Sequence, residues 1–261
     1  MSPLSVSSLS SSSSIPTIPK TLTLTPTHPL PRRLRFKHLL PPSRPLSLSS
    51  PSSYSPLPLI SATSSSIPVE DLVESDWSFL DPPDPAAAAA AARRAVAAAG
   101  ELSPESRLLV AMPAMGFVDA LVESAGPCEL LVAVHESLFA LAMIKEAHDR
   151  VRCWQGGAAA VPEKFAPFDA VFVCYFPGMG LSIAELLESL APRCSPGARV
   201  VICFDQGRQV VEQHWQQYPD MVTADLPDKA LLEKAATENS YQITEFVDEP
   251  NFYLAVLRCQ K

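Results

Sequence analysis

Two strand-like segments near the end of the chain constrain the fold more than any other feature. Segments 241–247 and 252–257 have the composition of β-strands, and only residues 248–251 separate them. So short a link can join only antiparallel neighbours, because a parallel connection needs a crossover of a dozen residues or more. Since the second segment is apolar at nearly every position, we expect it to lie inside a sheet, with a neighbour on each side.

The chain before this pair alternates between short apolar runs and helical patterns. The strands expected are 108–112, 130–134, 151–154, 169–174 and 198–204, the last after a turn at 195–197, and the helices expected are 117–124, 137–150, 182–190, 209–217 and 228–239. Apolar strands separated by helices indicate a parallel sheet covered on both faces. We therefore predict an α/β, Rossmann-like doubly wound fold, with a mostly parallel seven-stranded sheet and a C-terminal β-hairpin that gives one antiparallel strand.

The N-terminal region differs from the rest of the chain in charge. Residues 1–69 contain no acidic residue and six basic ones, and they consist mostly of Ser, Thr, Pro and Leu. This composition is typical of an organelle transit peptide, and such a segment cannot bury enough apolar surface to fold alone. We predict that residues 1–68 are a disordered plastid transit peptide and that the protein acts in the chloroplast stroma, beginning between about Ala62 and Glu70.

The composition fits two other cellular addresses less well than the plastid. A secretory signal needs an unbroken apolar core, whereas Ser or Pro interrupts every apolar run here. A mitochondrial presequence stays open as the alternative, although it would favour an Arg-rich amphipathic helix near Met1. Only Lys20 is charged before Arg32, and proline recurs throughout and blocks a helix. The composition therefore favours the plastid.

The region after residue 69 is strongly acidic. The chain has 20 basic and 28 acidic residues, of which six basic residues lie in 1–69, so 14 basic and 28 acidic residues remain, a net charge of −14. Nucleic-acid backbones need a positive surface, so nucleic acid is not expected as the main partner. No apolar run approaches the length of a membrane span. The six cysteines form no C-x-x-C pair and no Cys/His cluster, so no zinc site is expected.

Residues 69–100 form a lead-in and an alanine-rich segment ahead of the main domain, 101–261. Asp84 and Pro85 open the alanine-rich segment and Gly100 follows it. Asp as N-cap, Pro at the first helical position and Gly just past the end predict a helix. Trp77 and Phe79 in the acidic lead-in are expected to pack on the domain.

Several stretches of the main domain, taken together, carry a family resemblance. They are 132–142, the Phe-Asp-Ala-Val stretch at 168–171, 187–204 with its Ser-Pro-Gly turn, and 252–254. In this order, five βα units followed by a hairpin, the chain resembles the class I S-adenosylmethionine-dependent methyltransferase family over roughly 101–258. The resemblance implies S-adenosylmethionine as cofactor and methyl transfer to a small-molecule or protein acceptor.

The resemblance also places a cofactor site at the ends of the first three strands. The family's first loop is rich in glycine because the backbone approaches the cofactor closely there. Here that loop runs from Met112 through Pro113, Ala114 and Met115 to Gly116, the one glycine retained. The resemblance therefore assigns Met112, Ala114 and Gly116 to the cofactor site.

The ends of the second and third strands supply the other candidates. The family's acidic residue at the end of strand two, which accepts hydrogen bonds from the ribose hydroxyls, corresponds to His135. Glu136 would serve only if the strand ended one residue earlier. After strand three, Trp154 would stack on adenine and Gln155 would hydrogen-bond it. For each of these residues a purely structural role stays open.

The sequence leaves the chemistry itself unassigned. Asp205, His135 and His214 are candidate bases by position alone, and no partner is evident for any of them. The segment 174–178 lacks the Asn-Pro-Pro-Tyr type of motif, which disfavours methylation of adenine or glutamine nitrogens. The absence of G-x-G-x-x-G disfavours a nicotinamide enzyme. Two functions remain: a plastid methyltransferase, or a non-catalytic relative that is an interaction or assembly subunit of a plastid complex.

Overall fold

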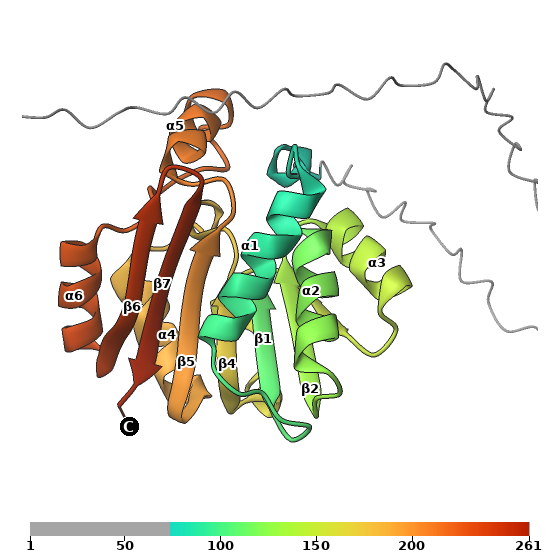
Figure 1. Ribbon diagram of the computed structural model, residues 1–261, viewed down its shortest axis with the longest axis vertical. Coiled ribbons are helices and arrows are strands. Elements are labelled where there is room, and N and C mark those ends of the chain that lie inside the picture. Colours follow the sequence, from blue (N-terminus) through green and yellow to red (C-terminus); the bar gives the residue numbers. More distant parts are fainter. Residues whose placement is uncertain (1–73, 261) are drawn as a thin grey trace, which may run out of the picture. The chain divides into compact units, whose positions relative to one another are not determined.

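A single mixed sheet organises the part of the chain that the structure, a computed structural model, describes, residues 74–260 (Figure 1). The predicted transit peptide and its cleavage region lie outside the described residues. The strand order is β3-β2-β1-β4-β5-β7-β6. The strands are β1 Arg107–Ala111, β2 Leu130–His135, β3 Arg152–Gln155, β4 Phe168–Val173, β5 Cys194–Phe204, β6 Tyr241–Glu249 and β7 Phe252–Cys259.

Strand β7 is the antiparallel strand, as predicted from the short link. It lies between β5 and β6 and runs opposite to both, so its arrow in Figure 1 points the other way from that of β5. Val201 of β5 faces Val256 of β7, and both are fully buried. The remaining pairs, β1 with β2 and β4, β2 with β3 and β4 with β5, are parallel. The predicted sheet is therefore confirmed.

Helices cover both faces of the sheet. They are α1 Pro85–Ala98, α2 Met115–Ala125, α3 Leu138–Ala147, α4 Ile183–Leu190, α5 Arg208–Gln217 and α6 Lys229–Glu238. Helices α1, α2 and α3 pack on the face that presents Leu108 and Val110, whereas α4 and α6 pack on the face that presents Leu109 and Val171. Because β-strand side chains alternate between faces, the continuous apolar strands supply both cores. Among residues 74–260, no helix has the length and apolar content that crossing a bilayer requires.

The alanine-rich helix forms as its sequence signals predict. The Asp84 carboxylate accepts hydrogen bonds from the backbone N–H groups of Ala86 (2.9 Å) and Ala87 (3.2 Å), and Pro85 is the first helical residue. Such a cap stabilises a helix by about 1 kcal/mol. Gly100 has a φ of +82° just beyond the end, where a side chain would be strained.

Most element boundaries differ from those predicted by one or two residues, and the start of β5 and the end of α3 differ by more. Strand β5 begins at Cys194, so the expected turn at 195–197 lies within it. Cys194 pairs with Phe168 before a register shift, and the residues that follow form an irregularity. Helix α3 ends at Ala147 and not at residue 150, and β3 begins at 152 and not at 151, because the Val151 N–H bonds to the His148 carbonyl in a tight turn.

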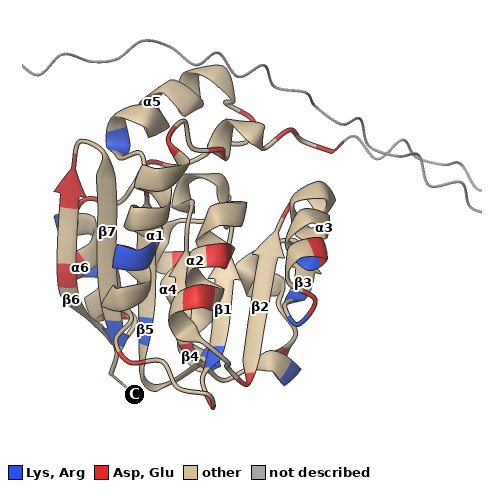
Figure 2. Cartoon of the chain, turned by 45° about the vertical axis from the view of Figure 1, so that its right-hand side comes forward, with Lys and Arg blue, Asp and Glu red and all other residues tan. Residues whose placement is uncertain are grey.

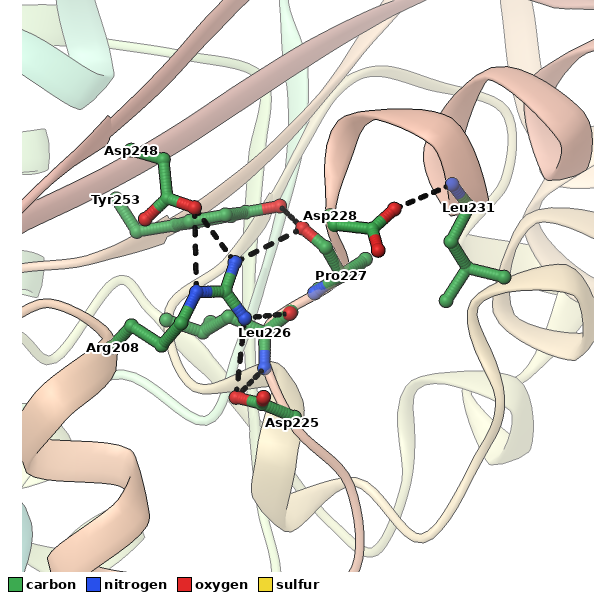
Figure 3. A network of polar contacts seen from close by, with 8 residues as sticks. All are labelled: Arg208, Asp225, Leu226, Pro227, Asp228, Leu231, Asp248 and Tyr253. Carbon is green, nitrogen blue, oxygen red and sulfur yellow. Dashed lines mark hydrogen bonds and ion pairs between the residues drawn. The ribbon is translucent and has the colours of Figure 1, made fainter.

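An ion-pair network around Arg208 fastens α5 to the hairpin (Figure 3). The guanidinium donates to the Asp248 carboxylate at 2.8 Å and lies 3.3 Å from that of Asp225. The Tyr253 hydroxyl donates to the Pro227 carbonyl at 2.7 Å. A planar cation with two acidic partners forms directional, charge-assisted bonds, so the segment between α5 and α6 is held against the sheet.

Candidate functional site

The carboxyl ends of β1, β2, β4 and β5 meet at one edge of the sheet, which is where ligands bind in open α/β folds. The first described residues, 74–81, lie at this edge, at the end toward which these strands point (Figure 1). Leu80 is buried there, and Trp77 and Phe79 pack against the core. The expectation that these aromatic residues pack on the domain is confirmed. We call residues 74–81 the strap.

Three cavities lie along this edge, all bordered by the strap. One of about 400 Å³ is bordered by Glu136, Gln155 and Gly178, and one of about 380 Å³ by Ala114 and His135. Both have the size of small-molecule pockets. The third is only about 50 Å³, enough for a water molecule or two, and is lined by residues that include Met112, Ala114, Gly116, Cys174 and Asp205. The predicted site residues therefore share one edge but do not converge on one cavity.

The turn between β1 and α2 keeps a shape that usually requires glycine. Met112 is buried with a φ of +51°, and its N–H donates to the Val134 carbonyl at 2.8 Å. For a residue with a side chain, this left-handed conformation costs about 1–2 kcal/mol. Ala114, the N-cap of α2, has no side-chain oxygen to cap the helix, and the space beside Gly116 is open. The first turn of α2 thus presents uncapped N–H groups, which attract negative charge.

His135 ends β2 and is buried, with 2% of its surface exposed. The Ser137 backbone N–H donates to its Nδ1 at 2.9 Å, and the Trp77 ring meets it edge-on with centroids 5.6 Å apart. Burial lowers the pKa of His135 to about 4, although Glu74 opposes this shift. The ring is therefore neutral near pH 7, with its proton on Nε2. His135 can therefore donate one hydrogen bond, from Nε2–H, at the position where the resemblance implies a carboxylate that accepts hydrogen bonds from the ribose hydroxyls.

Glu136 does not meet the condition set for it by the sequence. Strand β2 ends at His135, so Glu136 stands outside the strand, exposed at the border of the 400 Å³ cavity. Gln155 borders the same cavity and donates from Nε2 to the Glu136 carbonyl at 3.2 Å. Trp154 is half-buried against the core and borders none of the three cavities. The structure thus gives Trp154 a packing role.

Glu74 is a site residue that the sequence did not reveal. Its Oε1 accepts hydrogen bonds from the Phe139 N–H at 2.9 Å and from the Ser137 hydroxyl, and its side chain borders both larger cavities. The Phe139 and Ser137 donors lower its pKa, so the carboxyl is ionised. Ser137, the N-cap of α3, could be expected from its position. Glu74 could not be expected, because it lies 63 residues before Ser137 and no local sequence pattern links the two.

Trp77 is the second residue whose place at the site was missed. Its side chain borders both larger cavities, and its ring lies so close to Gly178 that a Cβ atom added there would be 2.9 Å from it. Next along the strap, Phe79 stacks on Tyr218, with centroids 4.2 Å apart. Trp77 therefore divides the space above the strand ends.

The three candidate bases have different surroundings. Asp205 follows β5 and is half-buried in the wall of the smallest cavity, and burial raises its pKa. His214 is enclosed by aromatic rings, its Nδ1 lies 3.1 Å from the Tyr175 hydroxyl, and burial lowers its pKa. His135 is covered by Trp77. Asp205 therefore borders the smallest cavity and His135 the 380 Å³ cavity, both beside the β1–α2 turn, whereas His214 borders none of the three.

The charged and metal-binding side chains of the described residues are dispersed. Within 74–260, no three His, Cys, Asp or Glu side chains gather in a way that could hold a metal ion. The six cysteines, all in this range, form no disulfide bond. Lys and Arg are spread over separate elements, whereas acidic residues stand along β6 and the strap (Figure 2). The absence of nucleic acid as main partner stays a prediction.

Comparison with known proteins supports the fold assignment. Searches by sequence found no matching family model and no matching curated protein. Among solved structures, an S-adenosylmethionine-dependent methyltransferase from Mesorhizobium loti is 12% identical, with a TM-score of 0.51 over 63% of this chain and 95% of that one. Geranyl diphosphate C-methyltransferase from Streptomyces coelicolor, in complex with S-adenosyl-L-homocysteine, is 14% identical, with a TM-score of 0.54 over 71% and 90%.

A third match is a chain from the complex between the Haloferax volcanii Trm112 methyltransferase activator and a methyltransferase. It is 14% identical, with a TM-score of 0.55 over 66% of this chain and 89% of that one. At such identities the likeness establishes the fold alone. The chain has the fold of the class I S-adenosylmethionine-dependent methyltransferases.

Proposed function

We propose that the protein is an S-adenosylmethionine-dependent methyltransferase-like protein of the plastid, which transfers a methyl group to a small-molecule or protein acceptor. The observation that carries this proposal is the β1–α2 turn. Left-handed Met112, the uncapped start of α2 and the open space at Gly116 keep the form of a loop that approaches a ligand. A fold neighbour described with S-adenosyl-L-homocysteine supports the same ligand class.

The residues at this edge fit the cofactor in part. The α2 N–H groups would hold its carboxylate, and the His135 Nε2–H would donate to a ribose hydroxyl. Gln155 borders the 400 Å³ cavity and would hydrogen-bond the adenine ring. Bound S-adenosylmethionine supplies an electrophilic methyl group on a sulfonium. Asp205, beside the turn, is placed to take a proton from an acceptor.

Calorimetry with the full chain tests cofactor binding. We expect S-adenosylmethionine and S-adenosyl-L-homocysteine to release heat, and Gly116→Val to abolish it, because a side chain there fills the open space. Gly157→Val is the matched control, since Gly157 also faces open space but borders none of the three cavities. No heat at millimolar ligand, in the wild type and in a Trp77→Ala variant alike, would contradict the proposal.

A second function is favoured by a patch on α3. Leu138, Phe139 and Met143 are 47%, 70% and 44% exposed, and exposed apolar groups of this kind often mark interaction surfaces. With a buried neutral histidine in place of an acid, they support a non-catalytic interaction subunit. Phe139→Asp would then reduce the native mass of the protein's complex in plastid extracts. An unchanged mass, together with cofactor binding, would contradict this alternative.

The plastid address needs its own test, because it rests on residues 1–68. We expect these residues, fused to a fluorescent protein, to label plastids in plant cells. Labelling of mitochondria instead would establish the alternative address.

A further inference from the structure

The strap is attached to the carboxyl edge through few contacts. Glu74 bonds to the start of α3, Trp77 lies against His135 and Gly178, Phe79 stacks on Tyr218, and Leu80 is buried. Its other residues, Ser75, Asp76, Ser78 and Asp81, are exposed. A segment that buries so few side chains opens at a lower free energy than the sheet beneath it.

The Trp77 ring fills a flat space between His135 and Gly178, which we call the slot. The His135 imidazole stands nearly perpendicular to the ring, at an interplanar angle of 87°, and Gly178, in the turn after β4, has no side chain to collide with it. The slot opens on one side to the 400 Å³ cavity and on the other to the 380 Å³ cavity. A ligand with its flat ring in the slot would have room for its remaining groups in either cavity.

We infer that the slot between His135 and Gly178 is a subsite for a planar aromatic ring, such as a nucleobase, and that Trp77 occupies it as an internal competitor. The inference rests on the proposed function, because S-adenosylmethionine carries a purine. A ligand ring enters only when the strap withdraws, so the apparent affinity is the intrinsic affinity multiplied by the fraction of molecules in which Trp77 has left the slot. Residues 81–83, which include two prolines and link the strap to Asp84, the N-cap of α1, are mostly exposed, so they can move while the cap stays in place.

Two substitutions release Trp77 from the slot, but only the first leaves the slot vacant. Trp77→Ala removes the competing ring, and Gly178→Ala places a Cβ atom where the ring lies and so displaces the strap. Gly157→Ala is the control, because it adds the same methyl group in open space. Cys174 reports on the strap, since it is buried in the small cavity that Leu80 and Pro82 also line.

The experiment measures two quantities on each full-length variant. The first is the rate at which a maleimide labels Cys174, resolved by peptide mass spectrometry. The second is the calorimetric affinity for adenosine and for indole, which carry the ring without the rest of a cofactor. We expect Trp77→Ala to increase both the labelling rate and the affinity for the two ring compounds by about tenfold. Gly178→Ala should increase the labelling rate alone, and Gly157→Ala neither.

The outcomes separate this inference from the proposed function. If Trp77→Ala binds the ring compounds but neither S-adenosylmethionine nor its demethylated product, the subsite stands and the methyltransferase proposal fails. If the ring compounds do not bind Trp77→Ala, or bind it more weakly than they bind the wild type, the subsite inference is overturned whatever the cofactor does. Unchanged labelling of Cys174 in Trp77→Ala overturns the role of the strap as a cover.

Discussion

The hairpin side of the molecule and the strap side differ in how many buried contacts hold them. On the hairpin side, β7 is buried between two strands, and Arg208 ties α5 to the adjoining segment with two carboxylates. On the strap side, a mostly exposed segment is held by four side chains, which are Glu74, Trp77, Phe79 and Leu80. The contrast teaches that the sheet is fixed by redundant burial, whereas the surface at which a ligand would bind depends on a few contacts that can be broken one at a time.

The largest expected effect lies in the sheet. Phe172 of β4 is fully buried and packs against Phe117, with centroids 5.6 Å apart. Phe172→Ala should lower the free energy of unfolding by about 4 kcal/mol, because it leaves a cavity between the sheet and α2. Phe139→Ala on the exposed face of α3 should change it by less than about 0.5 kcal/mol. Equal losses in urea unfolding would show that the core does not carry the stability.

The second largest expected effect is the pH dependence of the free energy of unfolding, which depends on His135 at the end of β2, beneath Trp77 of the strap. Because burial lowers the pKa of His135 to about 4, the unfolded chain binds a proton below about pH 6.5 while the folded protein does not. The free energy of unfolding should therefore fall on acidification, by about 3 kcal/mol between pH 6.5 and 4. His214, whose pKa is also lowered by burial, acts in the same direction.

His135→Asn isolates this contribution. The asparagine oxygen can take the place of Nδ1 as acceptor from the Ser137 N–H, but it does not titrate in this range. The variant should lose most of the stability change between pH 6.5 and 4 and keep the part due to other groups. A pH profile identical to that of the wild type would show that His135 is protonated equally in both states.

The third effect breaks the network on the hairpin side. Arg208→Ala should lower the free energy of unfolding by about 2 kcal/mol, because it leaves carboxylates and carbonyls without their shared donor. Arg208→Lys should recover only part of the loss, since an ammonium cannot reproduce the planar arrangement of bonds. Full recovery in urea unfolding would mean that charge alone, and not geometry, holds this segment.

The two sides also differ in how far the sequence predicts them. The sheet order could be predicted because apolar runs, helical spacing and the short link at 248–251 are local signals that agree with one another. The β5 start at Cys194 was missed because Ser, Pro and Gly at 195–197 indicate a turn, whereas pairing with β4 across an irregularity extends the strand. At this place, pairing between strands that are distant in sequence overrides the local turn signal.

The candidate site was predicted less completely for the same reason. Gly116, His135 and Gln155 could be placed at the edge from strand order, and they lie there. Glu74 and Trp77 could not, because their partners Ser137, Phe139 and Gly178 are far away in sequence and nothing in the strap's spacing indicates them. A ring-filled slot follows from tertiary contact alone.

The smallest expected effect sharpens the contrast, because it should alter the strap without altering the fold. Glu74→Gln keeps the shape of the side chain but removes the charge that the α3 N-terminus favours. We expect an unchanged melting temperature, because Ser137 still caps the helix through the Ala140 N–H at 3.1 Å. Hydrogen exchange should nevertheless become faster in the first turn of α3, at Phe139, since its acceptor is weakened. Glu105→Gln, at an exposed position away from the edge, is the matched control. A drop in melting temperature equal to that of Arg208→Ala would mean that the strap is part of the fold, and the distinction between the two sides would be lost.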